Sequence, residues 1–123
     1  VAHWNIKGPQ FASLHPLFET FAVSIANHND TIAERAVTLG ARAYGTVRHV
    51  ATTSRLPEYP QATTRDIEHV KLLADRIELY LQGLRESREL ADTHRDTDSV
   101  DVLTQIITEF EKNAWFLHAS LES

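Results

Sequence analysis

The sequence has 123 residues, enough for one domain of ordinary size, and its 42% hydrophobic and 24% charged content is typical of a folded chain. Its formal net charge is −5 and its 12 basic residues are scattered, which argues against nucleic-acid binding by this surface because phosphate contacts need clustered Lys and Arg. The absence of cysteine excludes disulfides and thiolate metal sites. No apolar run approaches the ~18 residues of a membrane-spanning helix, and no leader resembles a signal peptide.

The first third of the chain predicts a turn followed by a long helix. Residues 1–4 resemble the end of a helix whose body lies upstream, and since the sequence does not start with Met we expect the single domain, residues 1–123, to be N-terminally incomplete. Gly8-Pro9 predicts a turn. Helical periodicity then runs from Gln10 to Leu39, with Gly40 as a C-cap signal. Pro16 indicates either that this helix begins there or that it is kinked there. The predicted apolar stripe is Phe11, Leu14, Phe18, Phe21, Ile25, Ile32 and Val37.

Three further helices are predicted in the rest of the chain. A short one covers residues 42–54, weakened by Gly45, and residues 56–61 form a loop with two prolines. A long helix, capped by Thr63 or Thr64, runs to about residue 93, and Asp98 or Ser99 caps a last helix that carries apolar residues to Leu121. Long amphipathic helices with short links predict an all-α bundle. A four-helix bundle needs one more long helix, which we expect upstream of residue 1.

Five residues are candidate metal ligands: His3, His15, Glu19, Asp30 and Glu34. His15 and Glu19 lie one helical turn apart on one face, and Asp30 and Glu34 repeat that spacing. A mixed set of imidazole and carboxylate suits ferrous iron, manganese or zinc. The Gly8-Pro9 turn folds the segment before it back along the long helix, so His3 can approach His15.

The helix rise separates the two pairs. Fifteen positions at 1.5 Å each place them roughly 22 Å apart, too far for one ion to contact both within one chain. Either the pairs are unrelated surface charges, or a second copy of the helix lies antiparallel across a two-fold axis near Ser24 and Ile25 and brings His15 opposite the partner's acids. Structural roles compete with the metal hypothesis. Acids at this spacing usually form a solvated helix face, and a single histidine at a helix start is more often structural. Arg35 also offers Asp30 and Glu34 a local ion pair.

At these positions the sequence resembles the Dps family of mini-ferritins, the DNA-binding proteins from starved cells. The resemblance begins with HWNIKGPQFASLH, which is followed by Glu19, and it covers nearly the whole chain. The later segments that carry it are Asp30-x-x-Ala33-Glu34-Arg35-Ala36, Leu39-Gly40, Tyr59-Pro60, Leu73-Ala74-Asp75-Arg76, residues 98–104 from Asp98 to Thr104, and residues 112–116 from Lys112 to Phe116.

The resemblance implies a ferritin-like four-helix bundle with a short extra helix in the middle connection, matching residues 42–54. It implies a cytoplasmic homododecamer whose ferroxidase centres lie at two-fold interfaces, oxidise Fe2+ preferentially with hydrogen peroxide, store ferric oxide and protect DNA. By this resemblance His3 and His15 of one chain and Asp30 and Glu34 of its partner bind iron, with two ions possible per site and zinc or manganese as substitutes. Trp4 matches the tryptophan beside the site, either as an electron donor or as a packing residue.

The resemblance also has departures. The family usually has aspartate at the position of Glu19, the first helix is nearly all missing, and no basic tail is present. The residues present therefore do not support DNA binding, although a DNA-condensing, nucleoid-associated protein with little iron chemistry is the alternative function. Asp96, Asp98 and Asp101 are candidates for an iron-entry pore at a three-fold axis, and N-terminal capping of the last helix is their competing role.

Overall fold

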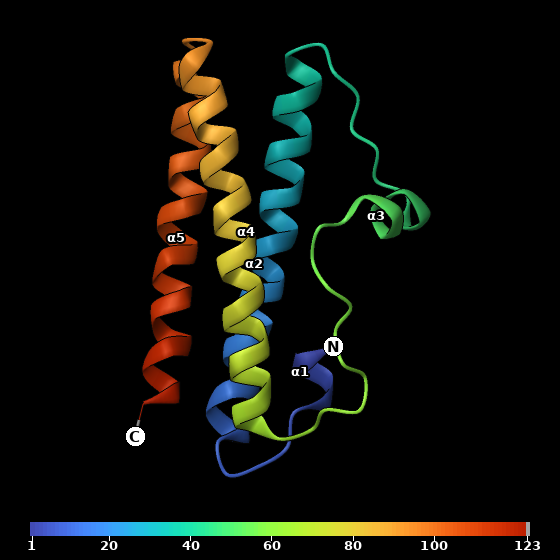
Figure 1. Ribbon diagram of the computed structural model, residues 1–123, viewed down its shortest axis with the longest axis vertical. Coiled ribbons are helices and arrows are strands. Elements are labelled where there is room, and N and C mark those ends of the chain that lie inside the picture. The colour runs from blue at the N-terminus through green and yellow to red at the C-terminus, as the bar shows by residue number, and fades with distance from the viewer. Residues whose placement is uncertain (123) are drawn as a thin grey trace.

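The computed structural model describes residues 1–122, which form five helices and contain no strand. Three long helices run side by side, namely α2 (Phe11–Thr38), α4 (Asp66–Thr93) and α5 (Thr97–Leu121) (Figure 1). Two short helices, α1 (Ala2–Asn5) and α3 (Val47–Thr53), flank α2 along the chain. The connection that carries α3 returns the chain to the end where α2 begins, so α2 and α4 run in one direction and α5 runs against them (Figure 1). The predicted all-α bundle is confirmed.

An apolar core shared by the three long helices holds the bundle together. At its centre Phe110 of α5 is 0% exposed, and the rings of His28 from α2 and Tyr80 from α4 meet it edge-on at centroid distances of 5.4 and 5.3 Å. Burial of such side chains is the main force that pairs the helices, at about 25 cal/mol per Å2 of apolar surface. The buried core residues of the long helices are Leu14, Phe18, Phe21, Val70, Ala74, Ile77, Leu81, Leu84, Ile106, Ile107, Phe110, Ala114 and Leu117. None of the helices within residues 1–122 has the length and apolar content to cross a membrane.

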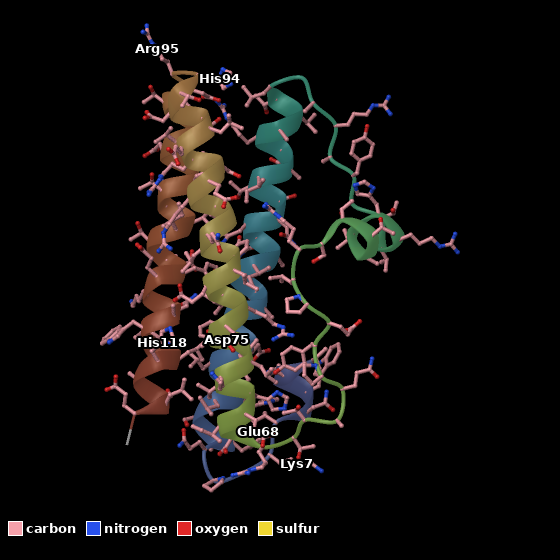
Figure 2. The ribbon with its side chains drawn as sticks, viewed as in Figure 1. Lys7, Glu68, Asp75, His94, Arg95 and His118 are labelled. Atoms are coloured by element: carbon pink, nitrogen blue, oxygen red, sulfur yellow. The ribbon has the colours of Figure 1, made fainter. Side chains whose placement is uncertain are left out.

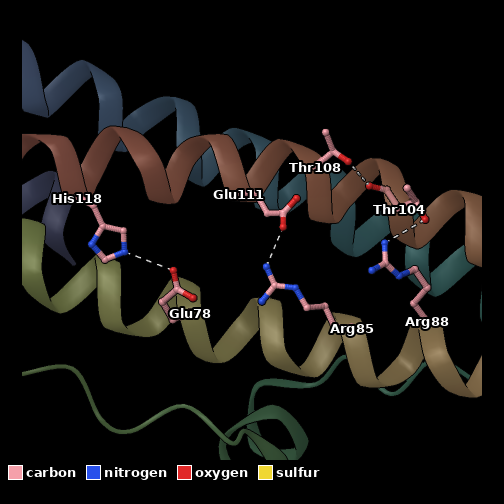
Figure 3. Close-up of polar contacts among 7 residues, drawn as sticks. All are labelled: Glu78, Arg85, Arg88, Thr104, Thr108, Glu111 and His118. Carbon is pink, nitrogen blue, oxygen red and sulfur yellow. Dashed lines mark hydrogen bonds and ion pairs between the residues drawn. The ribbon is translucent and has the colours of Figure 1, made fainter.

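Polar contacts line the outer seam between α4 and α5 (Figure 3). Arg85 donates to Glu111 at 2.9 Å, and Nε2 of His118 lies 3.3 Å from Oε1 of Glu78. Both pairs are about half exposed, so each contributes at most about 1 kcal/mol. These contacts therefore reinforce the register between α4 and α5, which the packing of the core already sets.

The long helix α2 begins before its proline. Its first residue is Phe11, so Pro16 lies inside the helix, and the carbonyl of Ala12 that Pro16 cannot bond sits in an exposed turn where water can donate to it. At the other end Gly40 has φ +96° and its N–H bonds to the carbonyl of Val37, which confirms the predicted C-cap. The side chain of Val37, although part of the predicted stripe, is exposed.

The predicted N-caps of α4 and α5 are wrong. Thr63 and Thr64 do not cap α4, whose N-cap is Arg65 without a side-chain bond, because a backbone bridge to the first turn of the chain occupies this end. Neither Asp98 nor Ser99 caps α5; the cap is Asp96, whose carboxylate accepts the N–H of Ser99.

The short helix is narrower than predicted. It spans Val47–Thr53 instead of residues 42–54. Its start is fixed by Thr46, whose hydroxyl oxygen accepts the N–H of His49. The stretch around Gly45 before it is not helical, consistent with the low helix propensity of glycine.

Candidate metal centre

His3 on α1 and His15 on α2 lie face to face and hold each other through the backbone. Nδ1 of His3 is 2.8 Å from the carbonyl oxygen of His15, and Nδ1 of His15 is 2.8 Å from the carbonyl oxygen of His3. The two rings are stacked with centroids 3.9 Å apart and planes 16° apart. The turn at Gly8 therefore brings the two histidines together as the sequence predicts.

This reciprocal bonding selects one tautomer. A carbonyl oxygen can only accept, so Nδ1 of each ring carries the proton, and Nε2 of each neutral ring keeps its lone pair. Neutral imidazole with its second nitrogen bonded to a carbonyl is the usual form of a metal-binding histidine. Both rings are half-buried, and Phe11 stacks on His15 at 4.9 Å. The donor set thus fits a divalent metal ion.

The turn between the histidines is fixed by a residue distant in sequence. Asp66, the first residue of α4, is buried and accepts the N–H of Gln10 at 2.8 Å. Its own N–H donates to the carbonyl of Lys7 at 2.8 Å. Gly8 has φ +130°, and a Cβ there would lie 2.7 Å from the Asp66 carboxylate. The sequence analysis missed Asp66, and no local pattern marks it because its partners lie more than fifty positions earlier in the chain.

The site lies at the end of the bundle where α2 and α4 begin. Lys7 and Glu68 mark this end, and His94 and Arg95 mark the opposite one (Figure 2). The N–H of Lys7 bonds to the carbonyl of Thr64 at 2.7 Å, so the segment before α4 is tied to the histidine turn.

The predicted carboxylate ligands lie on the exposed surface of α2. Glu19 follows His15 by one turn, whereas Asp30 and Glu34 lie near the other end of this unbroken helix. Within the described residues, His, Asp and Glu side chains nowhere gather in the threes that could hold a metal ion. One copy of the chain thus brings His3 and His15 together and leaves Asp30 and Glu34 apart from them.

Arg35 does not form the local ion pair considered from the sequence. Its guanidinium reaches α5, where it donates to Ser99 at 3.0 Å and to Asp96 at 3.1 Å. The side chains of Asp30 and Glu34 are exposed on the same turns of α2. Their carboxylates are therefore not neutralised by this neighbouring arginine.

Among the remaining candidates, Asp96 is held by hydrogen bonds, whereas Asp98, Asp101 and Trp4 are exposed. Hydrogen bonds from Ser99, followed by the contact with Arg35, hold the pKa of Asp96 below its ordinary value, so the capping role exists for this residue. Asp98 and Asp101 are exposed at the start of α5. Trp4 is 81% exposed, so it does not pack into the core of this chain.

Comparison with known proteins places this geometry in a family. The sequence model of the ferritin-like domain matches residues 1–123. The "DNA protection during starvation protein" of Agrobacterium fabrum is 36% identical over 121 residues, covering 98% of this chain and 75% of the relative. The chain belongs to the Dps family of ferritin-like proteins. "DNA protection during starvation protein 2" of Bacillus anthracis is 35% identical and is covered over 81% of its length, with 97% of this chain matched.

Two solved structures superpose closely on this chain. The Dps protein of Vibrio cholerae, described as a member of a superfamily of ferritin-like diiron-carboxylate proteins, superposes with a TM-score of 0.92 at 29% identity over 98% of this chain and 76% of its own. Antigen TpF1 of Treponema pallidum superposes with a TM-score of 0.94 at 27% identity over 98% of this chain and 78% of its own. The ferritin-like all-α fold predicted from the sequence is thereby confirmed.

Proposed function

We propose that this Dps chain oxidises Fe2+ at centres shared by two copies. His3, His15 and Glu19 of one copy face Asp30 and Glu34 of the other, and ferric product is stored inside a homododecameric shell. The observation that carries the proposal is the His3–His15 pair, whose backbone bonds leave both Nε2 lone pairs available for a metal ion. Removal of iron and peroxide would be this chain's part in the DNA protection for which its relatives are named.

The chemistry follows from the donor set. Neutral imidazoles bind ferrous iron, and carboxylates favour the more highly charged ferric product. Hydrogen peroxide takes one electron from each of two Fe2+ ions, its O–O bond breaks, and two protons complete two molecules of water. A paired oxidation of this kind avoids the hydroxyl radical that a single electron would release. Zinc or manganese would compete for the same ligands.

The two-copy arrangement follows from the unbroken α2 helix. Because α2 is helical from Phe11 to Thr38, the histidine end and the Asp30–Glu34 end are roughly 22 Å apart. An antiparallel copy of α2 crossing near Ser24 and Ile25 would bring opposite ends together at two equivalent sites. We also propose that Asp98 and Asp101 line an iron-entry pore, together with the capping residue Asp96.

Mixing two inactive variants tests the shared site. His15→Ala and Asp30→Ala are each expected to oxidise Fe2+ with peroxide far more slowly than wild type. In a mixed dimer, one site lacks both ligands and the other is intact. Co-assembly of equal amounts from the unfolded state should therefore restore about a quarter of the centres.

Two outcomes would contradict the proposed shared site. Mixing that restores no activity, although the native mass shows mixed assemblies, would contradict a shared site. Single variants with wild-type rates would remove these residues from the site altogether. Asp75→Ala is the matched control, since Asp75 is an exposed acid on α4 that pairs only weakly with Lys71 at 3.9 Å, and it should leave the rate unchanged.

The surface of the described residues gives little support to the DNA-condensing alternative. Arg35, Arg55 and Arg85 each lie within ion-pair distance of an acid. With a net charge of −5, these residues do not form the free basic patch that phosphate contacts need. A gel shift against plasmid DNA is expected to show no complex, and a tight salt-sensitive complex would support the alternative.

A further inference from the structure

Tyr59 and His69 form a hydrogen-bonded pair that the proposed iron chemistry does not use. The hydroxyl of Tyr59, in the segment before α4, lies 2.5 Å from Nδ1 of His69 on the first turns of α4. Their rings are nearly parallel, with planes 7° apart and centroids 5.7 Å apart. His69 is 0% exposed, so this is a buried imidazole with a phenol as its partner.

The direction of the hydrogen bond can be deduced from the other ring nitrogen. Nε2 of His69 lies 3.0 Å from the carbonyl oxygen of Thr63, which can only accept, so Nε2 carries the ring proton. Nδ1 therefore has the lone pair and accepts the O–H of Tyr59. Burial lowers the pKa of His69 and raises that of Tyr59 to about 12, so in the resting state the proton stays on the phenol.

The pair is held in place by its surroundings. Arg76 lies over the Tyr59 ring, 4.9 Å from its centroid, and donates to the carbonyls of Pro57 and Glu58 at 3.2 and 2.8 Å. These bonds fix the backbone on the N-terminal side of Tyr59, so its hydroxyl is kept against the imidazole. The segment is also tied to the histidine turn of the metal centre by the Lys7–Thr64 bond.

The other two tyrosines provide a contrast. Tyr44 is 64% exposed, and its ring lies tilted beside His49. The hydroxyl of Tyr80 is buried and has no hydrogen-bond partner within the described part of the chain. Oxidation of a phenol at neutral pH requires loss of its proton, because the phenol radical cation is a strong acid. Tyr59 is the tyrosine whose hydroxyl proton has a buried base within bonding distance.

We propose that Tyr59 and His69 form a one-electron redox site that quenches oxidising radicals. Tyr59 gives one electron to a hydroxyl radical, which becomes hydroxide, while its O–H bond breaks and the proton forms a bond to Nδ1 of His69. The products are a neutral tyrosyl radical and an imidazolium, whose charge the nearby Glu68 carboxylate favours. An electron from Fe2+, which becomes ferric, and the return of the proton restore the phenol.

This proposal rests on the proposed function only for the source of radicals and of the returning electron, so it is tested in metal-free protein. A flash-generated ruthenium(III) polypyridyl complex serves as the one-electron oxidant. The background is a Trp4→Phe/Trp115→Phe variant, because both indoles are exposed and would compete. Radicals are followed by transient absorption and by electron paramagnetic resonance after rapid freezing.

The tyrosine panel decides the assignment. We expect a phenoxyl radical that is lost in Tyr59→Phe and kept in Tyr44→Phe and Tyr80→Phe. His69→Gln, which accepts a hydrogen bond but takes no proton, should slow the oxidation by about 100-fold, the lower range for a positioned base. The rate in the His69-containing protein should also fall in heavy water.

Two results would overturn the proposal. An undiminished radical yield in Tyr59→Phe would leave the pair a purely structural link, as would a rate that is the same in light and heavy water. Should His69→Gln fail to fold by circular dichroism, Tyr59→Phe, which removes a single oxygen, still decides. Because no iron is present, these outcomes are independent of whether the two-copy iron centre proves correct.

Discussion

Replacing Gly8 with alanine should disrupt the turn that brings the two histidines together. At φ +130° an alanine is strained, which costs about 1–3 kcal/mol. Its Cβ would also lie 2.7 Å from the Asp66 carboxylate, so the bond from Gln10 must lengthen or break, and a bond to a charged group contributes about 1.5–3 kcal/mol. The free energy of unfolding should fall by about 3–5 kcal/mol, a decrease of roughly 10–20 °C in Tm for a chain of this size.

Thermal unfolding followed by circular dichroism at equal protein concentration measures this change. Gly45→Ala is the matched control, because a Cβ there has nothing within 4 Å, and it should change stability by no more than about 1 kcal/mol. Gly8→Ala should also slow Fe2+ oxidation, whereas Gly45→Ala should not. If Gly8→Ala unfolds within about 0.5 kcal/mol of wild type, as ordinary surface substitutions do, the turn is not the constraint described here.

Three further changes test other parts of the structure. Asp96→Asn should lower Tm at neutral pH. Because the pKa of Asp96 is depressed in the folded chain, the carboxylate stabilises the fold above its ordinary pKa of 3.8, and this stabilisation is lost as the pH falls through the folded pKa. The Tm values of wild type and variant should therefore converge in acid. Phe110→Ala should cost about 3–5 kcal/mol in denaturant unfolding, against at most about 0.5 kcal/mol for Leu90→Ala, which is 61% exposed; equal effects would contradict the assigned core. Glu19→Ala should weaken Fe2+ binding at least about 10-fold by calorimetry, while Glu19→Asp retains most of the affinity, and an unchanged Glu19→Ala would remove this residue from the site.

Periodicity predicts the long helices well because it reflects what the core requires. The range predicted from Gln10 to Leu39 differs from α2 by one residue at each end, and Gly40 marks the stop as expected. These signals are local, since a stripe every three to four residues and a glycine in the left-handed region need no knowledge of distant parts of the chain.

The start of α4 and the contacts that hold the Gly8 turn could not be predicted in the same way, because the residues involved are far apart in sequence. Thr64 supplies its carbonyl to Lys7 instead of capping α4 with its side chain, and Asp66 holds a turn more than fifty positions earlier. Arg35 likewise passes over neighbouring acids to reach Asp96. Tyr59 and His69 are ordinary residues in the sequence, and their pairing depends on how the loop packs against α4.

Asp30 and Glu34, the carboxylates proposed to come from a second copy, are exposed on this chain and are not placed in a site by one copy. Helix rise separates Asp30 and Glu34 from the histidines, and the continuous α2 helix agrees with that distance. The proposed contribution of a second copy depends on assembly, which the mixing experiment tests.

The reciprocal bonding of His3 and His15 has a consequence for metal affinity. Fixing a free side chain when a ligand binds costs about 0.5–1.5 kcal/mol of conformational entropy. Here each ring is already held by the other's backbone, so that loss occurs when the chain folds and not when the ion arrives. The two imidazoles are consequently preorganised before any ion arrives, each with an unprotonated Nε2. Under the proposed function, selection among ferrous iron, zinc and manganese would then fall to the carboxylates on α2, of which Asp30 and Glu34 would come from the second copy.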